Sequence, residues 1–232
     1  MADQHNSNIP AVANQISADI PDIKENLEWH QDVFQKVLNS YHASSLTSIG
    51  FVTTLWVPAS AMVPTATNGA TAGINEYATN DIIRAYYAFD ATTEQFVGFE
   101  VVMPEGWNRS TVRAKFYWSS ATGSTTGDTA EWEIGGIALS NADTLDTAIG
   151  TAITVSDATT ADNGTDLQIS AATAAITVGG TPALGDLVHY KVSRNVGGTD
   201  DMTEDAWLFG VLIQIAETFP DYSGTNAIVA WS

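Results

Sequence analysis

Two different spacings of apolar residues divide the chain. Near the N-terminus, apolar positions alternate in steps of four and three residues, which is a heptad pattern typical of an amphipathic or coiled-coil helix. The seam consists of Ile16, Ile20, Ile23, Leu27, His30, Phe34, Val37 and Tyr41. Asp19 can cap this helix, and Pro21 falls in its first turn, where a missing N–H costs nothing. The pattern predicts a helix over about residues 20–42.

The heptad seam has two interpretations. In the first, it associates with other copies of the chain in a short parallel bundle, and Val33 and Leu38 widen the stripe in a way that suits three strands, or docking into a partner groove, better than two strands. In the second, the helix lies on its own β domain. His30 is either a packed core histidine or part of a ring of histidines at a symmetry axis, able to hold an anion or sense pH. We assign residues 1–49 as an anchoring and oligomerising segment, with Ile20, Ile23, Leu27, His30, Phe34, Val37 and Tyr41 as its contact residues.

From residue 50 to residue 232 the apolar period changes to two. In the segment 111–118, Val112, Ala114, Phe116 and Trp118 alternate with polar or amphipathic residues, which is typical of a half-buried antiparallel strand. Further strands are predicted at 51–57, 82–89, 96–102, 132–139, 152–155, 167–170, 175–178, 187–193, 207–215 and 228–231. Loops are predicted at 64–73, 119–129, 156–165 and 195–204, with a helical turn compatible with 142–149. The fold class is therefore mainly β, an antiparallel β-sandwich of the jelly-roll type.

The charge balance excludes several partners. Eight basic residues face 27 acidic ones, for a formal net charge of −19. Phosphate backbones and anionic membrane surfaces are bound through clustered Lys and Arg, so neither nucleic acid nor a membrane is expected as a partner. The chain has no cysteine, which rules out disulfides and thiolate metal sites. No signal-peptide pattern and no membrane-length apolar run is visible in the sequence.

Catalytic motifs are not evident. Glu131 and Glu133 flank Trp132 and should share one face of a strand, a pairing that could serve a glycosidase but that also suits a solvated strand face. His189 is isolated in its predicted strand. The sequence therefore predicts no enzyme, no catalytic residue and no cofactor.

Two acidic loops raise the question of calcium. Their oxygen-bearing side chains suit Ca²⁺, although neither loop has EF-hand spacing and solvated acidic loops are expected in so negative a chain. The first loop contains Asp157, Asp162, Asn163 and Asp166, and the second contains Asp200, Asp201, Glu204 and Asp205. Neither is assigned as a metal site.

Aromatic side chains offer a different chemistry, because their ring faces can stack on sugars. Trp107, Tyr117 and Tyr87 are the candidates from the sequence, while most of the seven tryptophans are expected in the core.

Several segments resemble small structural proteins of tailed bacteriophages, in the same order along residues 55–215. They are 56–69 (WVPASAMVPTATNG), 89–90 (FD), 103–108 (MPEGWN), 115–118 (KFYW) and 185–188 (GDLV) before Arg194. Residues 20–26 (IPDIKEN) are similar to the virion-anchoring helices of such proteins. The resemblance implies a virion protein, often trimeric, that projects from the capsid or the tail.

The patterns and the resemblance together favour a structural virion surface protein. We expect a homotrimer anchored to other virion proteins by residues 1–49, with residues 50–232 displayed to adhere to host-surface polysaccharide or to stabilise the capsid. The alternatives are a small glycan-active enzyme of the depolymerase kind and a non-viral adhesin. Fibre and capsid-decoration roles both remain open at this stage.

Overall fold

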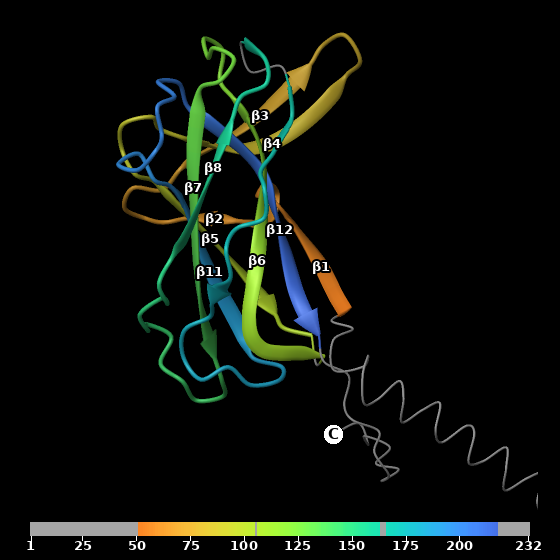
Figure 1. The fold of residues 1–232 in the computed structure, drawn as a ribbon, viewed down its shortest axis with the longest axis vertical. Helices are drawn as coiled ribbons and strands as arrows, with labels where there is room; N and C mark the ends of the chain where they lie inside the picture. The colour runs from red at the N-terminus through yellow and green to blue at the C-terminus, as the bar shows by residue number, and fades with distance from the viewer. Residues whose placement is uncertain (1–50, 105, 163–165, 218–232) are drawn as a thin grey trace, which may run out of the picture. The chain divides into compact units, whose positions relative to one another are not determined.

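The computed structural model describes residues 51–104, 106–162 and 166–217, and these form two antiparallel β-sheets packed face to face (Figure 1). The predicted anchor segment 1–49, with its seven contact residues, and the predicted strand 228–231 lie outside the described residues. The predicted mainly-β sandwich is confirmed for the part of the chain that is described. No described segment forms a helix that is long and apolar enough to cross a membrane.

The larger sheet, here called sheet A, is built around one long strand. It comprises β1 (Phe51–Pro58), β3 (Thr71–Tyr77), β4 (Ile82–Phe89), β6 (Trp107–Ser120), β9 (Gln168–Ile169), β10 (Ile176–Thr177) and β12 (Ala206–Glu217). One edge of β12 pairs with β6, while its other edge pairs with β4 near its start and with β1 along the rest. Strand β12 is therefore the centre of this sheet.

The smaller sheet, sheet B, has five strands in the order β2-β5-β11-β7-β8. Its strands are β2 (Val63–Pro64), β5 (Phe96–Val102), β7 (Thr129–Leu139), β8 (Ile153–Ala158) and β11 (Leu187–Arg194). A short 3₁₀ turn, η1 (Ala59–Ala61), carries the chain from β1 in sheet A to β2 in sheet B. This turn links the two layers next to the β3–β4 hairpin.

The core between the sheets follows from the two-residue alternation. In β6, Val112, Ala114, Phe116 and Trp118 are buried, as predicted, while the intervening Arg113 is exposed. Trp132 of β7 lies at the centre of an aromatic cluster: its ring stacks on Phe116 and meets Phe89 and Trp118 edge-on. Burial of such large rings from both layers supplies much of the hydrophobic stabilisation of a sandwich.

A buried arginine closes one end of the sandwich. The guanidinium of Arg194, at the end of β11, is fully buried and makes a two-pronged ion pair with Asp200. The same group donates hydrogen bonds to the backbone carbonyls of Phe89, Met202 and Glu204. Arg194 therefore fixes the loop that leads from β11 to β12.

The structure corrects some of the predicted boundaries. The predicted loop 64–73 contains the start of β3, so this strand was missed. Residues 142–149 form turns and bends, and the helical turn considered there is absent. Four strands are longer than predicted, and some extend into segments predicted as loops: β6, β7, β8 and β12. They are longer because strand pairing continues after the apolar alternation weakens.

Candidate functional site

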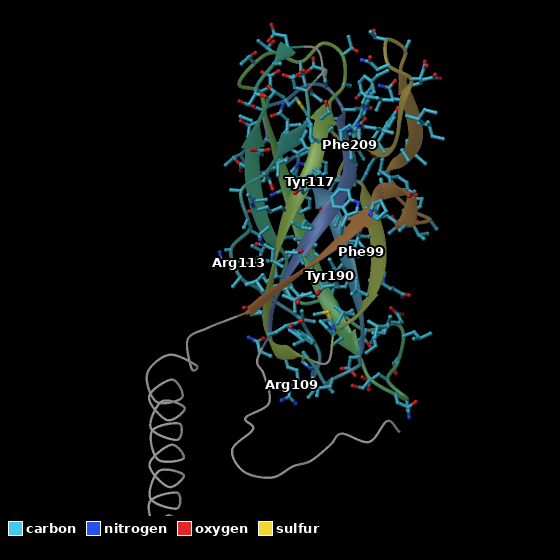
Figure 2. The ribbon with its side chains drawn as sticks, turned by 90° about the vertical axis from the view of Figure 1, so that its right-hand side faces the viewer. Phe99, Arg109, Arg113, Tyr117, Tyr190 and Phe209 are labelled. Carbon is cyan, nitrogen blue, oxygen red and sulfur yellow. The ribbon has the colours of Figure 1, made fainter. Side chains whose placement is uncertain are left out.

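The outer face of sheet A, turned away from the core, carries a concentration of aromatic side chains. We call this set the aromatic face; it consists of Trp56, Tyr86, Tyr117, Trp207 and Phe209. These residues come from β1, β4, β6 and β12, which are distant in sequence but adjacent in the sheet. Figure 2 looks onto the side that carries β1 and β12, with Phe209 and Tyr117 near the top and Arg113 and Arg109 below.

Trp56 and Tyr117 form the first aromatic pair. Their ring centroids lie 4.9 Å apart in an edge-on arrangement. Gly210 of β12 lies between the two strands, paired with Tyr117 on one side, and a Cβ atom there would come within 2.4 Å of the Trp56 ring. Because Gly210 has no Cβ atom, the Trp56 indole can lie close to the backbone of β12. With 47% of its surface exposed, Trp56 still presents a ring to solvent.

Tyr86 and Trp207 form the second pair, stacked with their centroids 4.5 Å apart. Here too a glycine lies beneath a ring, since a Cβ at Gly73 would meet the Tyr86 ring at 2.4 Å. Beside this pair, the guanidinium carbon of Arg84 lies 5.7 Å from the Phe209 ring centroid, within the range of a cation–π contact. The rings of both pairs are therefore held in place by contacts within the chain.

The charge on this face differs from that of the whole chain. By strand register, no Asp or Glu side chain projects outward from the strands of sheet A, although the chain has 27 acidic residues. Arg84, Arg113 and Lys115 do project there. The nearest carboxylates along the chain are those of Asp90, just after β4, and Asp205, just before β12. Partial burial raises the pKa of Asp205. The aromatic face is thus locally basic on an acidic protein.

Of the three aromatic residues singled out from the sequence, only Tyr117 lies on this face. Trp107 is 1% exposed, and Tyr87 is buried with its hydroxyl donating to the backbone carbonyl of Met62 at 3.0 Å. Those two predictions are wrong. Tyr86, the neighbour of Tyr87, points outward instead, because successive residues of a strand face opposite ways. Alternation alone could not say which of the two adjacent tyrosines faces the core.

Glu131 and Glu133 do share the outer face of sheet B, as predicted, while Trp132 points into the core on the other side. The Glu131 carboxylate is buried and accepts a hydrogen bond from the Thr199 backbone N–H at 2.6 Å. Partial burial raises the pKa of Glu133, and the carboxylate of Glu94 adds to the shift. Glu131 therefore holds the 195–200 loop rather than facing an open cleft.

Two further side-chain contacts lie on the outer face of sheet B. His189 lies 3.6 Å from the Glu100 carboxylate, and the Lys191 ammonium lies 4.6 Å from the Phe96 ring centroid. This face mixes both signs of charge and lacks the paired rings found on sheet A.

The acidic loops use their carboxylates within the chain. Asp162 accepts hydrogen bonds from the backbone and hydroxyl of Thr126, which lower its pKa, and Asp201 accepts one from the backbone of Thr129. Asp157 accepts a hydrogen bond from the Trp118 indole at 2.8 Å. Within the described residues, no group of three or more His, Cys, Asp or Glu side chains is arranged to hold a metal ion.

A pocket of about 430 Å³ adjoins the aromatic face. It lies between η1 and the β3–β4 hairpin and is lined by Ala59, Ser60, Ala72, Gly73, Ile74, Ala85, Tyr86 and Tyr87. This lining is mostly apolar and carries no charged side chain, so the pocket offers shape and apolar contact but no chemistry of its own. Through Tyr86 it borders the second aromatic pair.

No protein-family model matches the chain, and no curated protein matches it. The solved structures to which it is similar include carbohydrate-binding modules and glycan-active enzymes. An isomalto-dextranase from Arthrobacter globiformis, complexed with panose, is 19% identical over 69% of this chain and 23% of the enzyme, with a TM-score of 0.44. The CBM22-2 xylan-binding domain of Paenibacillus barcinonensis Xyn10C is 17% identical over 67% of this chain and 91% of that domain, with a TM-score of 0.39. A family 11 carbohydrate-binding module from Clostridium thermocellum, complexed with a mixed-linked tetrasaccharide, is 10% identical over 72% of this chain and 96% of the module, with a TM-score of 0.35.

Proposed function

We propose that the chain binds polysaccharide through the aromatic face of sheet A, as a non-catalytic surface protein displayed on the virion of a tailed bacteriophage. The observation that carries the proposal is the presence of two preorganised ring pairs, Trp56–Tyr117 and Tyr86–Trp207, on one face of one sheet. A pyranose ring presents a face of C–H groups, which stacks on an aromatic ring while its hydroxyls reach polar neighbours. A sheet face suits a polymer because it is open at both ends, so a long chain can extend beyond it.

Preorganisation is the main physical reason to expect useful affinity. When a ligand binds to a mobile ring, ordering the side chain weakens the binding free energy by about 0.5–1.5 kcal/mol for each side chain immobilised. Trp56 already leans over Gly210 against Tyr117, and Tyr86 leans over Gly73 against Trp207. These contacts reduce the ordering cost before a sugar binds.

The non-catalytic role is supported by how the carboxylates are used. Glycoside hydrolysis generally needs two carboxyl groups facing one substrate. By register, the strands of sheet A place no carboxylate on the aromatic face, and Glu131 on sheet B is occupied by the backbone of Thr199. The virion role is supported by the order of the segments in residues 55–215 that resemble phage structural proteins.

The test is a binding assay with the Trp56→Ala variant. Affinity for a panel of soluble polysaccharides, both neutral and acidic, is measured by affinity electrophoresis and by calorimetry. We expect Trp56→Ala to weaken binding about 30-fold, since loss of a central aromatic contact at a binding hot spot costs about 2 kcal/mol. The matched control is Phe96→Ala, which removes an aromatic ring from the outer face of sheet B and should leave affinity unchanged.

A second variant separates ring position from ring presence. Gly73→Val keeps every aromatic residue but places side-chain atoms where the Tyr86 ring lies, so it should also weaken binding. Circular dichroism and thermal melting check that each variant is folded. Unchanged affinity in both Trp56→Ala and Gly73→Val, or binding by no polysaccharide in the panel, would contradict the proposal.

A further inference from the structure

Basic residues are scarce in this chain and unevenly placed. The described residues include six of them, at Arg84, Arg109, Arg113, Lys115, Lys191 and Arg194. Arg194 is buried against Asp200, and Lys191 lies over Phe96 on the outer face of sheet B. Three of the other four project from the same face as the ring pairs, at Arg84, Arg113 and Lys115. The distribution concentrates positive charge where the aromatic rings are.

Strand register places these charges beside the first ring pair. Lys115, Leu212 and Trp56 lie in one row across β6, β12 and β1. The next row along the strands contains Arg113 and Gln214. Adjacent strands are about 4.8 Å apart and alternate residues about 7 Å apart, so both cations lie within a few sugar units of the Trp56 ring. A polymer stacked on Trp56 would therefore pass over Lys115 or Arg113.

These cations are available to an external anion. Among the described residues, the close contacts between basic and carboxylate groups join His189 to Glu100 and Arg194 to Asp200, so neither Lys115 nor Arg84 has a carboxylate partner there. Arg113 donates one hydrogen bond to the backbone carbonyl of Thr173 at 3.4 Å, which positions the guanidinium without neutralising it. These solvated cations can therefore contact an external anion without first breaking an ion pair within the chain.

We infer that the ligand of the aromatic face is an anionic polysaccharide, whose sugar rings stack on Trp56 and whose acidic groups contact Lys115 and Arg113. This inference rests on the proposed function and adds the charge class of the glycan. Attraction at this site is short-ranged, because the net charge of −19 repels an anionic polymer at a distance. At physiological salt, screening over about 8 Å suppresses that repulsion but leaves direct contacts with Lys115 and Arg113 effective.

The experiment compares acidic polymers with their uncharged counterparts. Polygalacturonate and hyaluronan are each tested against the same polymer after chemical reduction of its carboxyl groups, and a sulfated galactan is tested against its desulfated form, all at about 150 mM salt. We expect at least one acidic form to bind about 10-fold more tightly than its neutral counterpart. The double variant R113Q/K115Q should remove that preference, while K191Q, which removes a positive charge from the outer face of sheet B, should keep it.

The outcomes separate the two proposals. If the polymers bind, Trp56→Ala weakens them, and the acidic and neutral forms bind equally, the anionic class is wrong while polysaccharide binding stands. An acidic preference that survives R113Q/K115Q would also overturn the inference, since residues other than Arg113 and Lys115 would then recognise the acidic groups of the polymer. If no polymer of either kind binds, polysaccharide binding itself is contradicted, and with it this inference.

Discussion

The pKa values of two aspartates in this acidic chain are shifted in opposite directions by burial and by hydrogen bonding. Asp157 points into the sandwich from β8 and accepts a hydrogen bond from the Trp118 indole. Burial raises its pKa above the ordinary value of 3.8, and the hydrogen bond from Trp118 only partly offsets this. Asp162, in contrast, is exposed, and its pKa is lowered by hydrogen bonds from Thr126. Two aspartates a few residues apart therefore respond to pH in opposite directions.

This contrast predicts a pH-dependent difference between two variants. Because the folded-state pKa of Asp157 is raised, the folded protein holds this proton longer than the unfolded chain, and the contribution of Asp157 to stability is lost as pH rises above about 3.8. Asp157→Asn has no charge to bury, so the variant does not lose this stability as pH rises, and its amide oxygen can still accept the hydrogen bond from Trp118. Its free energy of unfolding, relative to the unmodified chain, should therefore increase from about pH 4 to about pH 7 in urea titrations.

Asp162→Asn is the matched control with the opposite sign. Its lowered folded-state pKa gives stability that is present above the unfolded pKa and lost as pH falls, so this variant should lose stability relative to the unmodified chain as pH rises to about 4 and should change little from about pH 4 to about pH 7. If both variants shift in the same direction with pH, the assignment of burial and hydrogen bonding as separate causes is wrong.

At the level of the elements, the sequence predicted strands best where one face is buried. In β6 the apolar alternation is regular, and the predicted inward and outward sets both match the structure. Strand β3 (TAGINEY) was missed because both of its faces are largely exposed, including Ile74 at 73%, so no alternation marks it. Its place in sheet A comes from pairing with β4 instead.

The aromatic face was predictable only in part. Tyr117 could be assigned to an outward position because it lies in a strand with clear alternation. Trp56 and Trp207 belong to strands about 150 residues apart in the chain, and which residues meet across β1, β12 and β6 depends on register that no local pattern encodes. The glycines beneath the rings, Gly73 and Gly210, are recognisable only once that register is known.

Arg194 gives a prediction for the connection between β11 and β12. Its guanidinium and the Asp200 carboxylate are both almost completely buried. Arg194→Met would leave Asp200 charged and unpaired and would release three carbonyls, so we expect the free energy of unfolding to fall by about 3–5 kcal/mol in urea titrations. The double variant with Asp200→Asn should recover part of that loss. A change below about 1 kcal/mol in Arg194→Met would show that this loop does not depend on the arginine.

At the scale of the whole molecule, the oligomeric state remains a prediction from the sequence. The heptad seam predicts a trimer for the full chain in light scattering, and Phe34→Asp should convert it to a monomer by placing a charge in the apolar seam. Gln35→Asp, which lies off the seam, is the control and should remain trimeric. A monomeric full chain, or a trimer that persists in Phe34→Asp, would favour the alternative in which the predicted helix packs on its own β domain.

A trimer would also change how the aromatic face binds. Three faces carried by one particle engage a long polymer with an effective concentration set by the spacing between them, so weak single contacts combine into tight attachment. Measuring affinity for the same polysaccharide in the full chain and in Phe34→Asp would give that gain directly.

The pairing of β1 with β12 has a consequence for biosynthesis. Every residue from Phe51 to Pro58 pairs with a residue between Gly210 and Glu217, so sheet A lacks its central strand until the chain has been synthesised to that point. Contacts this distant along the chain slow folding, because a long loop must close before they form. On the ribosome, β1, β4 and β6 are therefore synthesised before β12, the strand with which all three pair. We expect a nascent chain that stops before Ala206 to be recognised by chaperones or proteases as unfolded, instead of persisting as a smaller sandwich.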